Sequence, residues 1–288
     1  MTGRLAGKVA LVTGAGRGQG RSHAIRMAQE GADVIAVDIC ADIASNGYPL
    51  ASAADLKETA AQVEALDRRV VAEIADVRDV AGLGAAVAEG VAQLGRLDIV
   101  VANAGIAAVG PDRPVQAYLD TVAVNYTGVL NTIEAALPHL GDGSSIICTG
   151  STAALLPVGT RNPSLGPGGV GYSTAKRNLA RMVHEMAALL ASRRIRVNAV
   201  HPYNTNTDML HSRPMRRVFR PDLDDPAMED VEPALLRGSP MGVPWIEPSD
   251  VSEAVVFLAA DESRYLTGTQ LRIDGGHMLP LMSPGVPD

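Results

Sequence analysis

Short apolar segments rich in β-branched residues alternate along the chain with longer segments in which apolar positions recur every three or four residues. The short segments lack a regular polar–apolar alternation, which is typical of strands buried on both faces of a parallel sheet. Strands that alternate with helices in this way form a doubly wound α/β fold. The pattern predicts seven parallel strands, at 8–12, 33–37, 70–74, 97–102, 144–149, 196–199 and 270–273.

The alternation continues without an internal repeat or a charged linker, so residues 1–288 are expected to form a single domain. Three segments interrupt it: an insertion at 40–54, a loop at 155–170 and a proline-rich segment at 203–245. One interpretation is surface decoration. However, each segment follows the carboxyl end of a strand, where open α/β sheets bind ligands. Long loops in compact domains are often functional, and we expect 203–245 to be a substrate lid.

Composition excludes several classes of protein. With 47% hydrophobic and 20% charged residues, the chain is not mainly disordered. A net charge of −7 argues against a nucleic-acid partner and against binding to a membrane surface. Two cysteines form no disulfide framework, and no apolar run approaches the roughly 20 residues that a bilayer requires. We expect a cytoplasmic protein, and the scattered histidines and cysteines predict no metal site.

The first candidate site is the glycine-rich loop that follows the first strand. Gly14, Gly18 and Gly20 allow a tight turn and a close approach of backbone N–H groups to a pyrophosphate, with Arg17 and Gln19 between them. The helix that starts near Gly18 offers its positive end to the same anion. A purely structural turn is the alternative. The position between a first strand and a first helix favours a dinucleotide site.

The acidic residue at the end of the second strand indicates which dinucleotide is bound. Asp38 stands where an acid accepts hydrogen bonds from the adenosine ribose, and its charge would repel a 2′-phosphate. Arg17 has the opposite effect, but no second basic residue follows Asp38 before Lys57. We therefore expect NAD rather than NADP; the alternative role for Asp38 is a loop or helix cap.

The second candidate site is Tyr172 with Lys176, which lie one turn apart on one face of a predicted helix. A phenol with a pKa near 10 is a weak base at neutral pH, and a neighbouring ammonium favours its deprotonated form. Such a pair is often only a surface contact. Here it uses one of three lysines in a chain that also carries a dinucleotide loop.

A hydrolase is a competing interpretation of the same region. The run 171–175 differs by one residue from the Gly-x-Ser-x-Gly elbow of hydrolases. That elbow requires a strand directly before it. A glycine- and proline-rich segment precedes the run in this chain, which disfavours the hydrolase.

With these motifs in order, residues 7–276 resemble the short-chain dehydrogenase/reductase family of the classical type. The glycine loop matches the family's Thr-Gly-x-x-x-Gly-x-Gly motif. The resemblance implies a Rossmann fold and a nicotinamide dinucleotide bound along residues that follow successive strands. Besides the glycine loop and Asp38, the implied cofactor residues are Asp76, Val77, Asn103, Ala104, Gly105, Tyr172, Lys176, Pro202, Thr205 and Thr207.

The resemblance also implies a catalytic tetrad of Asn125, Ser151, Tyr172 and Lys176. Tyr172 is implied to take the proton from a substrate hydroxyl, and Ser151 to hydrogen-bond the same oxygen. Lys176 is implied to lower the pKa of Tyr172 and to hold the nicotinamide ribose. Asn125 is implied to support a proton relay to Lys176 through water. Taken alone, Ser151 is typical of a turn and Asn125 of a helix interior, and only their order favours a site.

Departures from the family pattern narrow the resemblance. Tyr203 follows Pro202 where the family usually has glycine, and both the insertion 40–54 and the loop 155–170 are longer than is common. The glycine loop, this insertion and the His201-Pro202 pair are similar to the mycofactocin-associated subgroup, which includes carveol dehydrogenases. The subgroup implies a tightly held, poorly exchanging NAD whose electrons leave through an external redox carrier, mycofactocin.

We therefore expect an NAD-dependent dehydrogenase that interconverts an apolar secondary alcohol, such as the terpenoid carveol, and its ketone. Two alternatives stay open: a ketoreductase of the same family that exchanges NAD or NADP freely, and an NAD-binding scaffold without turnover. The expected substrate walls are apolar residues of the loop and the lid, namely Leu155, Leu156, Val158, Met209, Leu210, Met215, Met241 and Trp245.

We also expect a homotetramer. The predicted helices 114–138 and 171–192 carry surplus apolar residues that two-fold symmetry would cover. The strand 271–273 and the tail 279–286 are expected at a second interface.

Overall fold

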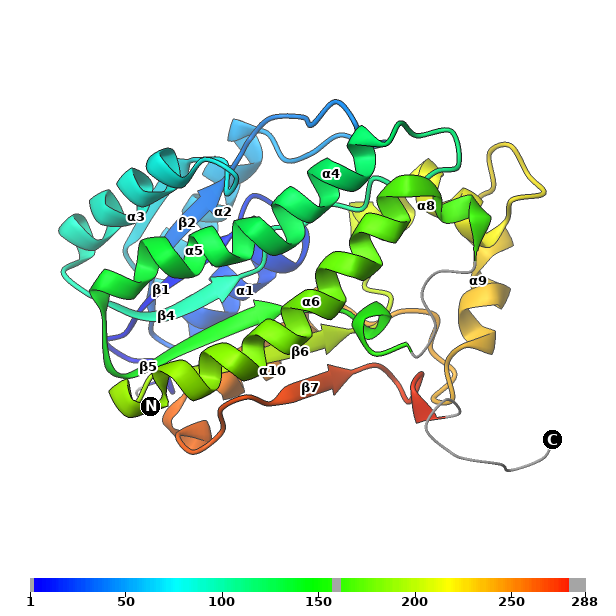
Figure 1. The fold of residues 1–288 in the computed structure, drawn as a ribbon. Helices are drawn as coiled ribbons and strands as arrows, with labels where there is room; N and C mark the ends of the chain where they lie inside the picture. The colour runs from blue at the N-terminus through cyan, green and yellow to red at the C-terminus, as the bar shows by residue number, and fades with distance from the viewer. Residues whose placement is uncertain (1–2, 157–161, 280–288) are drawn as a thin grey trace.

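The computed structural model describes residues 3–156 and 162–279, and its centre is a seven-stranded sheet (Figure 1). The strand order is β3-β2-β1-β4-β5-β6-β7, and each neighbouring pair runs parallel. The strands are β1 (Val9–Thr13), β2 (Asp33–Asp38), β3 (Val70–Ile74), β4 (Leu97–Ala102), β5 (Leu140–Thr149), β6 (Arg196–Pro202) and β7 (Gln270–Ile273). The doubly wound fold is confirmed, although β5 starts earlier and β6 ends later than the apolar runs indicated.

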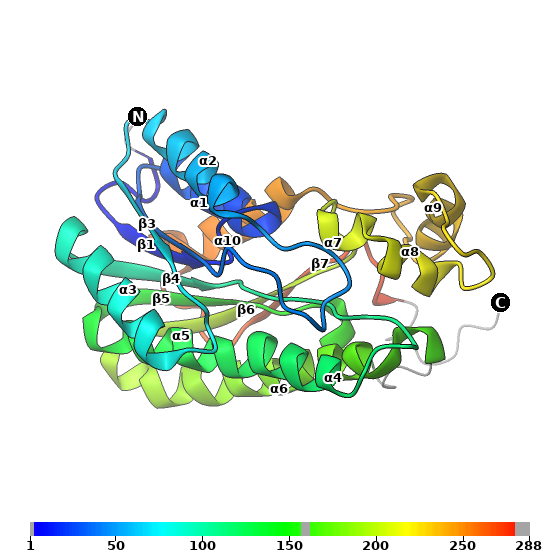
Figure 2. The same cartoon turned by 90° about the horizontal axis from the view of Figure 1, so that it is seen from above.

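Helices cover both faces of this sheet, as Figure 2 shows. One face carries α1 (Gly18–Gln29), α2 (Ala53–Glu64) and α10 (Pro248–Ala259). The other carries α3 (Val80–Leu94), α5 (Gly128–Ala136) and α6 (Gly166–Leu190), with α4 (Gln116–Val122) packed against α6. Short 3₁₀ turns lie at Leu137–His139, Thr152–Ala154, Pro163–Leu165, Ala191–Arg193 and Asp261–Ser263.

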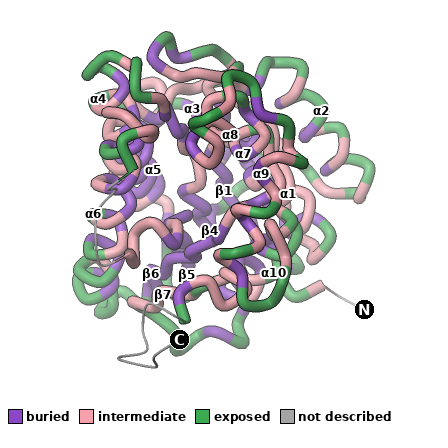
Figure 3. The backbone as a smooth tube through the Cα atoms, turned by 90° about the vertical axis from the view of Figure 1, so that its right-hand side faces the viewer, coloured by how far each residue is buried: buried purple, intermediate pink, exposed green. Residues whose placement is uncertain are grey.

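The absence of polar alternation in the central strands has a direct structural cause, because both faces of the sheet are buried there (Figure 3). Along β4, Val100 packs into the apolar layer beneath α3, α5 and α6. Its neighbours Ile99 and Val101 pack into the layer beneath α1 and α10. Successive side chains of a strand point to opposite faces, so both must be apolar here.

The predicted loop 155–170 is wrong over its last part, because α6 already begins at Gly166. Proline is tolerated in the first turn of a helix, and Pro167 stands there. The glycines serve close packing: a Cβ on Gly168 would lie 2.0 Å from the carbonyl oxygen of Ala108. Gly166 has a φ of +60°, which disfavours any other residue. Sequence periodicity cannot distinguish such a tightly packed helix start from a flexible loop.

The helix predicted over 114–138 is interrupted at the segment that carries Asn125. A π-helical turn, Ala123–Thr127, joins α4 to α5. Such turns occur frequently at functional sites.

The proposed lid is not an irregular loop, because it contains three helices. They are α7 (Asp208–His211), α8 (Arg213–Phe219) and α9 (Met228–Arg237), which lie beyond the carboxyl ends of the strands (Figure 1). Across the described residues, no helix is both long and apolar enough to cross a bilayer. Val158 and the tail beyond residue 279 lie outside the described residues.

The insertion 40–54 crosses from the end of β2 toward α4 (Figure 2). Ser45 donates a hydrogen bond of 2.6 Å to Asp120 of α4. The carbonyl oxygen of Pro49 accepts a hydrogen bond from Arg17 of the glycine loop. The insertion is therefore attached on both sides of the strand ends rather than projecting from the surface.

Candidate active site

A cavity of about 500 Å³ opens at the carboxyl ends of the strands, where the chain order reverses between β1 and β4. Ligands of open α/β sheets bind at this switch point. All the cofactor residues predicted from the sequence line the cavity: Gly14, Arg17, Gly18, Gln19, Gly20, Asp38, Asp76, Val77, Asn103, Ala104, Gly105, Tyr172, Lys176, Pro202, Thr205 and Thr207. Segments far apart in the sequence therefore meet in a single pocket.

The glycine loop has the geometry of a phosphate cradle. Gly14 and Gly18 have φ angles of +68° and +53°, and a Cβ on Gly20 would lie 1.9 Å from the carbonyl oxygen of Gly14. Larger residues would therefore distort the loop or fill the cavity. The Oε1 atom of Gln19 is buried without a hydrogen-bond partner. No side chain caps the start of α1, which leaves its first N–H groups available to an anion.

Asp38 performs two tasks at once, because it lines the cavity and also holds the loop around it. Its carboxylate accepts hydrogen bonds from the backbone N–H groups of Gly16, at 2.9 Å, and Cys40, at 3.1 Å. The side chain is only 7% exposed. Asp38 therefore both caps the loop, the role considered as an alternative, and lines the cavity.

Arg17, whose charge could favour a 2′-phosphate, is paired with the lid. Its Nη1 atom lies 3.1 Å from the Asp208 carboxylate, and its Nη2 atom donates to the Pro49 carbonyl oxygen. This ion pair reduces the positive charge that could attract a 2′-phosphate. Sequence spacing could not reveal it, since Asp208 is remote in the chain.

Asp76 at the end of β3 is paired with Arg78, whose Nη2 atom lies 2.6 Å from the carboxylate. Burial opposes ionisation, but the hydrogen bonds from Arg78 outweigh it and keep the pKa of Asp76 below its usual range. Asp76 thus lines the cavity as a charged, fixed acceptor.

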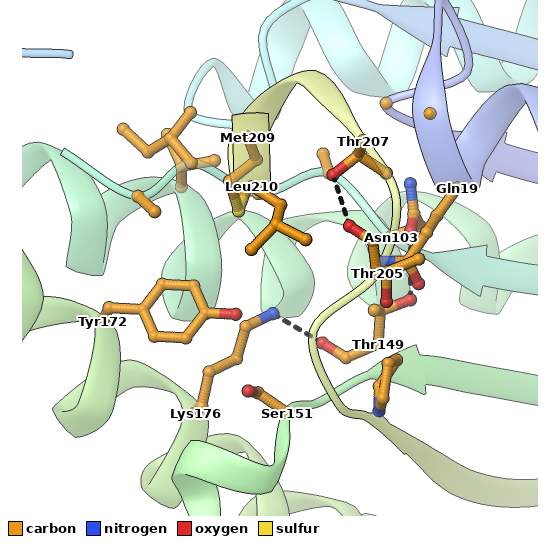
Figure 4. A pocket seen from close by; sticks show the side chains of 18 of the residues that line it. Gln19, Asn103, Thr149, Ser151, Tyr172, Lys176, Thr205, Thr207, Met209 and Leu210 are labelled. Carbon is orange, nitrogen blue, oxygen red and sulfur yellow. Dashed lines mark hydrogen bonds between the residues drawn. The ribbon is translucent and has the colours of Figure 1, made fainter. Parts of the chain in front are cut away.

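Three of the four tetrad residues meet at the opposite end of the cavity (Figure 4). Tyr172 and Lys176 project from α6, and Ser151 follows β5. The Lys176 ammonium donates a 2.6 Å hydrogen bond to the Thr149 carbonyl oxygen and lies 5.7 Å from the centroid of the Tyr172 ring. A fixed cation therefore stands beside two hydroxyl groups.

The pKa of Tyr172 is shifted in the direction opposite to the expected lowering. Burial raises the pKa of Tyr172, and the hydrogen bond with the Ser151 side chain only opposes this. Burial also lowers the pKa of Lys176 to about 8. Both charged forms are disfavoured for the same reason: the site is withdrawn from water.

Asn125 does not join the other three in the cavity. It lies on the π-helical turn, and its side chain forms hydrogen bonds with the main chain of Ile106. Its Nδ2 donates to the Ile106 carbonyl oxygen at 2.8 Å, and its Oδ1 accepts from the Ile106 N–H at 2.9 Å. The side chain thus fixes the segment after β4, and Asn125 is not among the described residues that line the cavity.

The residues after β6 hold each other in an ordered turn. Thr205 donates to the Tyr203 carbonyl oxygen at 3.0 Å, and Thr207 donates to the Thr205 carbonyl oxygen at 3.2 Å. Tyr203, which replaces the family's usual glycine, lines the cavity and donates a 2.9 Å hydrogen bond to Leu235 of α9. It therefore anchors the lid to the end of β6.

The apolar end of the cavity is only partly the one predicted. Of the expected wall residues, Leu156, Met209, Leu210 and Met215 line it. Met241 instead is 74% exposed, and Trp245 packs edge-on against His211. Leu155 is absent from the lining, which Val109, Leu165 and Phe219 complete.

Sequence reasoning also missed Tyr48 of the insertion. Its ring lines the cavity, its hydroxyl oxygen accepts a 3.4 Å hydrogen bond from the Ala107 N–H, and Arg17 lies 5.9 Å above its ring. Burial raises the pKa of Tyr48 to about 12, so its hydroxyl stays protonated. It is the only tyrosine within 40–54, and this was the one signal in the sequence.

Comparison with known proteins decides the family. The model described as Enoyl-(Acyl carrier protein) reductase matches residues 14–278. The chain belongs to the short-chain dehydrogenase/reductase family. The resemblance found in the sequence, including that to the carveol dehydrogenase-like group, is therefore confirmed.

Individual relatives are similar over nearly the whole chain. A (−)-trans-carveol dehydrogenase of Rhodococcus erythropolis is 43% identical, over 96% of this chain and 99% of its own length. A putative short-chain type dehydrogenase/reductase of Mycolicibacterium smegmatis is 46% identical, over 97% of this chain and 100% of its own. The crystal structure of a carveol dehydrogenase from Mycobacterium avium in complex with NAD superposes with a TM-score of 0.90, at 45% identity over 96% of this chain and 100% of that one.

Proposed function

We propose that this chain is an NAD-dependent dehydrogenase that interconverts an apolar secondary alcohol and its ketone. The observation that carries the proposal is the continuity of the cavity. One end presents the glycine loop and Asp38, and the other presents the hydroxyls of Tyr172 and Ser151 among apolar walls. A dinucleotide and a small apolar substrate can therefore meet in one continuous cavity.

The side chains divide the work at the substrate oxygen. When bound, NAD supplies the hydride acceptor. Tyr172 takes the alcohol proton at its phenolic oxygen, and the Ser151 hydroxyl donates a hydrogen bond to the same substrate oxygen. The Lys176 ammonium, held by the Thr149 carbonyl oxygen, stabilises the deprotonated form of Tyr172 that takes this proton. The Asn125 side chain contributes to the tetrad by its two hydrogen bonds with the main chain of Ile106, which fix the segment after β4.

The choice of NAD over NADP rests on two charges. Asp38 places a buried carboxylate beside the glycine loop. Arg17, the basic residue of that loop, could attract a 2′-phosphate, but it forms an ion pair with Asp208. Relatives are named NAD-dependent or were crystallised with NAD. We assign NAD as the cofactor.

The substrate class follows from the walls around Tyr172. Met209, Leu210 and Met215 of the lid face it together with Leu165 and Val109. Flexible methionines adapt to irregular apolar shapes. A relative is named for carveol, a terpenoid alcohol, and we propose a substrate of that kind.

We propose that the insertion retains the cofactor. Its contacts with Arg17, Ala107 and Asp120 hold Tyr48 and its neighbours across the cavity between the glycine loop and α4. Enclosing more of a ligand mainly slows its dissociation. An external redox carrier such as mycofactocin would then reoxidise the cofactor in place after the alcohol has reduced it.

The test combines a substrate panel with mass analysis of the purified protein. The panel contains (−)-trans-carveol, short secondary alcohols and an α,β-unsaturated thioester, the last because of the name of the matching family model. The alcohols are tried with added NAD and with a dye as electron acceptor, and the thioester, which would be reduced, is tried with NADH. Copurified NAD and dye-dependent oxidation of carveol support the proposal. Free turnover with added NAD indicates the exchanging ketoreductase, and bound NAD without any turnover indicates the scaffold.

We also propose the homotetramer and the cytoplasmic location expected from the sequence. Val115 and Leu119 near α4, and Val170 and Leu189 of α6, are large apolar side chains exposed by 46% to 70%. A second copy would cover them. Light scattering at micromolar concentration tests this, and a monomeric mass would contradict it.

A further inference from the structure

A buried histidine outside the cavity contacts the main chain of the catalytic serine. His201, near the end of β6, is fully buried and is not among the described residues that line the cavity. Its Nδ1 atom lies 3.2 Å from the backbone nitrogen of Ser151 and 2.9 Å from the Ser151 carbonyl oxygen. Its Nε2 atom lies 2.6 Å from Oε1 of Gln270 on β7. The proposed reaction gives this residue no role.

The partners of the ring define which nitrogen carries the proton. Gln270 donates its Nε2 hydrogen to the Ala180 carbonyl oxygen at 3.1 Å, so its Oε1 atom accepts from His201. Burial lowers the pKa of His201, which keeps the ring neutral. The single proton therefore lies on Nε2. Nδ1 then accepts the hydrogen bond from the Ser151 N–H, and its approach to the Ser151 carbonyl oxygen is a close contact without a hydrogen bond.

The fit around this contact is tight. A Cβ on Gly150 would lie 2.5 Å from both Nδ1 and Cε1 of His201, so only glycine lets the chain approach the ring. Gly150 donates to the Val200 carbonyl oxygen at 2.7 Å, which fixes the residue before Ser151. The Ser151 hydroxyl oxygen in turn accepts from the Ala153 N–H at 3.2 Å.

The same chain of contacts reaches the helix that carries the base. Ala180 lies on α6 one turn beyond Lys176, so the path runs from Ser151 through His201 and Gln270 to α6. Four elements that are separate in the sequence, namely the end of β5, β6, β7 and α6, are thus joined behind the site.

We propose that His201, oriented by Gln270, is a positioning residue that sets the Ser151 hydroxyl relative to Tyr172. The expected effect on kcat rests on the proposed dehydrogenase reaction. The contact itself can be tested without turnover. His201 acts through the backbone of Ser151 and does not touch the substrate.

The kinetic test uses two amide replacements of His201. His201→Asn places an amide near the position of Nδ1 and can still accept from Ser151, whereas His201→Gln reaches toward Gln270 and loses Ser151. We expect His201→Gln to lower kcat for dye-coupled carveol oxidation by about 10- to 100-fold with KM nearly unchanged, as for a misplaced catalytic group. His201→Asn should recover most of that loss.

A double-mutant cycle separates positioning from general damage. If His201 acts through Ser151, adding His201→Gln to Ser151→Ala should cause little further loss of kcat. The proposal would be overturned if the double variant lost kcat by the product of the two single losses, or if His201→Gln kept the wild-type kcat. Should His201→Gln fail to fold, Gln270→Leu removes the partner of Nε2 and is expected to give the same pattern, with the melting temperature as control.

Hydrogen exchange provides the readout that does not depend on activity. Residue-resolved measurements should show faster exchange of the Ser151 amide in His201→Gln, and unchanged exchange of the Gly150 amide, which bonds to Val200 instead. Unchanged protection of Ser151 would refute the contact. If the wild-type protein oxidised no alcohol while Ser151 lost protection, the proposed function would fail and the positioning contact would stand.

Discussion

The cavity is built from two regions of different kinds. Its wall consists of the strand ends and the α6 helix start, which carry the glycine loop, Ser151, Tyr172 and Lys176. Its roof consists of the insertion 40–54 and the lid 203–245, which carry Tyr48, Met209 and Met215. Wall residues are held by backbone hydrogen bonds and by packing within the sheet core. The roof is held by side-chain contacts such as Ser45–Asp120 and Arg17–Asp208.

This difference separates two properties of the proposed enzyme. The wall sets the chemistry, because proton transfer requires groups fixed within hydrogen-bond distance. The roof sets which substrates enter and how long the cofactor stays bound, because covering a ligand changes its exchange rate and leaves the reacting groups unchanged. Changes in the wall should therefore lower kcat, and changes in the roof should alter cofactor exchange and substrate range.

The largest effect is expected from Tyr172→Phe in the wall. Loss of the proton-transferring oxygen should lower kcat by about 1,000-fold, in line with general acid–base catalysis. NAD should still copurify, because no contact of the glycine loop is lost. Dye-coupled turnover and mass analysis measure both, and near-normal activity would contradict the assignment of Tyr172.

The next largest effect is expected from deleting residues 41–53 of the roof. Removal of about 2.8 kcal/mol of contact would shorten the residence of NAD roughly 100-fold. Added NAD should then support steady turnover without a dye. Ser45→Ala, which removes only the hydrogen bond to Asp120, is the control of unchanged chain length and should have a smaller effect. Protein that exchanges NAD freely before the deletion would show that the insertion does not retain it.

Asp38, where wall and roof meet, should control the preference for NAD. Two like charges about 4 Å apart repel by about 4 kcal/mol at an effective dielectric of 20. Screening reduces this, and we expect Asp38→Asn to narrow the ratio of NAD to NADP affinity by about 10-fold. Asparagine keeps only one of the two oxygens that accept from the Gly16 and Cys40 N–H groups, so the melting temperature is the control for the lost hydrogen bond. Calorimetry on nucleotide-free protein measures the ratio, and a wild-type preference for NADP would contradict the role of Asp38.

The smallest effect concerns pH. Because burial raises the pKa of Tyr172, the deprotonated base should become more abundant only as the pH rises above neutral. The kcat/KM for alcohol oxidation should therefore rise with pH, while ketone reduction, which needs the protonated phenol, should fall. The Ser151 hydroxyl opposes the raised pKa, so Ser151→Ala should move the rise to higher pH. A profile that is flat from neutral to alkaline pH would argue against Tyr172 as the titrating group.

Much of the wall could be predicted from the sequence, because it depends on local rules. A strand buried on both faces must be apolar throughout, and a phosphate cradle needs glycines such as Gly14 and Gly20 between a strand and a helix. Tyr172 and Lys176 share a face through helical spacing alone. These rules act over a few residues. The fold confirms the predicted sheet, and the predicted cofactor residues line one cavity.

The roof and the buried contacts depended on tertiary structure. Tyr48 reaches Ala107, Arg17 is paired with Asp208, and His201 holds the main chain of Ser151. Each contact joins residues that are far apart in the chain, and no local pattern encodes such a meeting. The sequence by itself therefore determined the fold, the order of the motifs and three of the four tetrad side chains that face the cavity. Only the packed structure decided that the Asn125 side chain turns away, that burial raises the pKa of Tyr172, and that the insertion crosses the cavity, because burial and charge pairing arise when distant segments pack together.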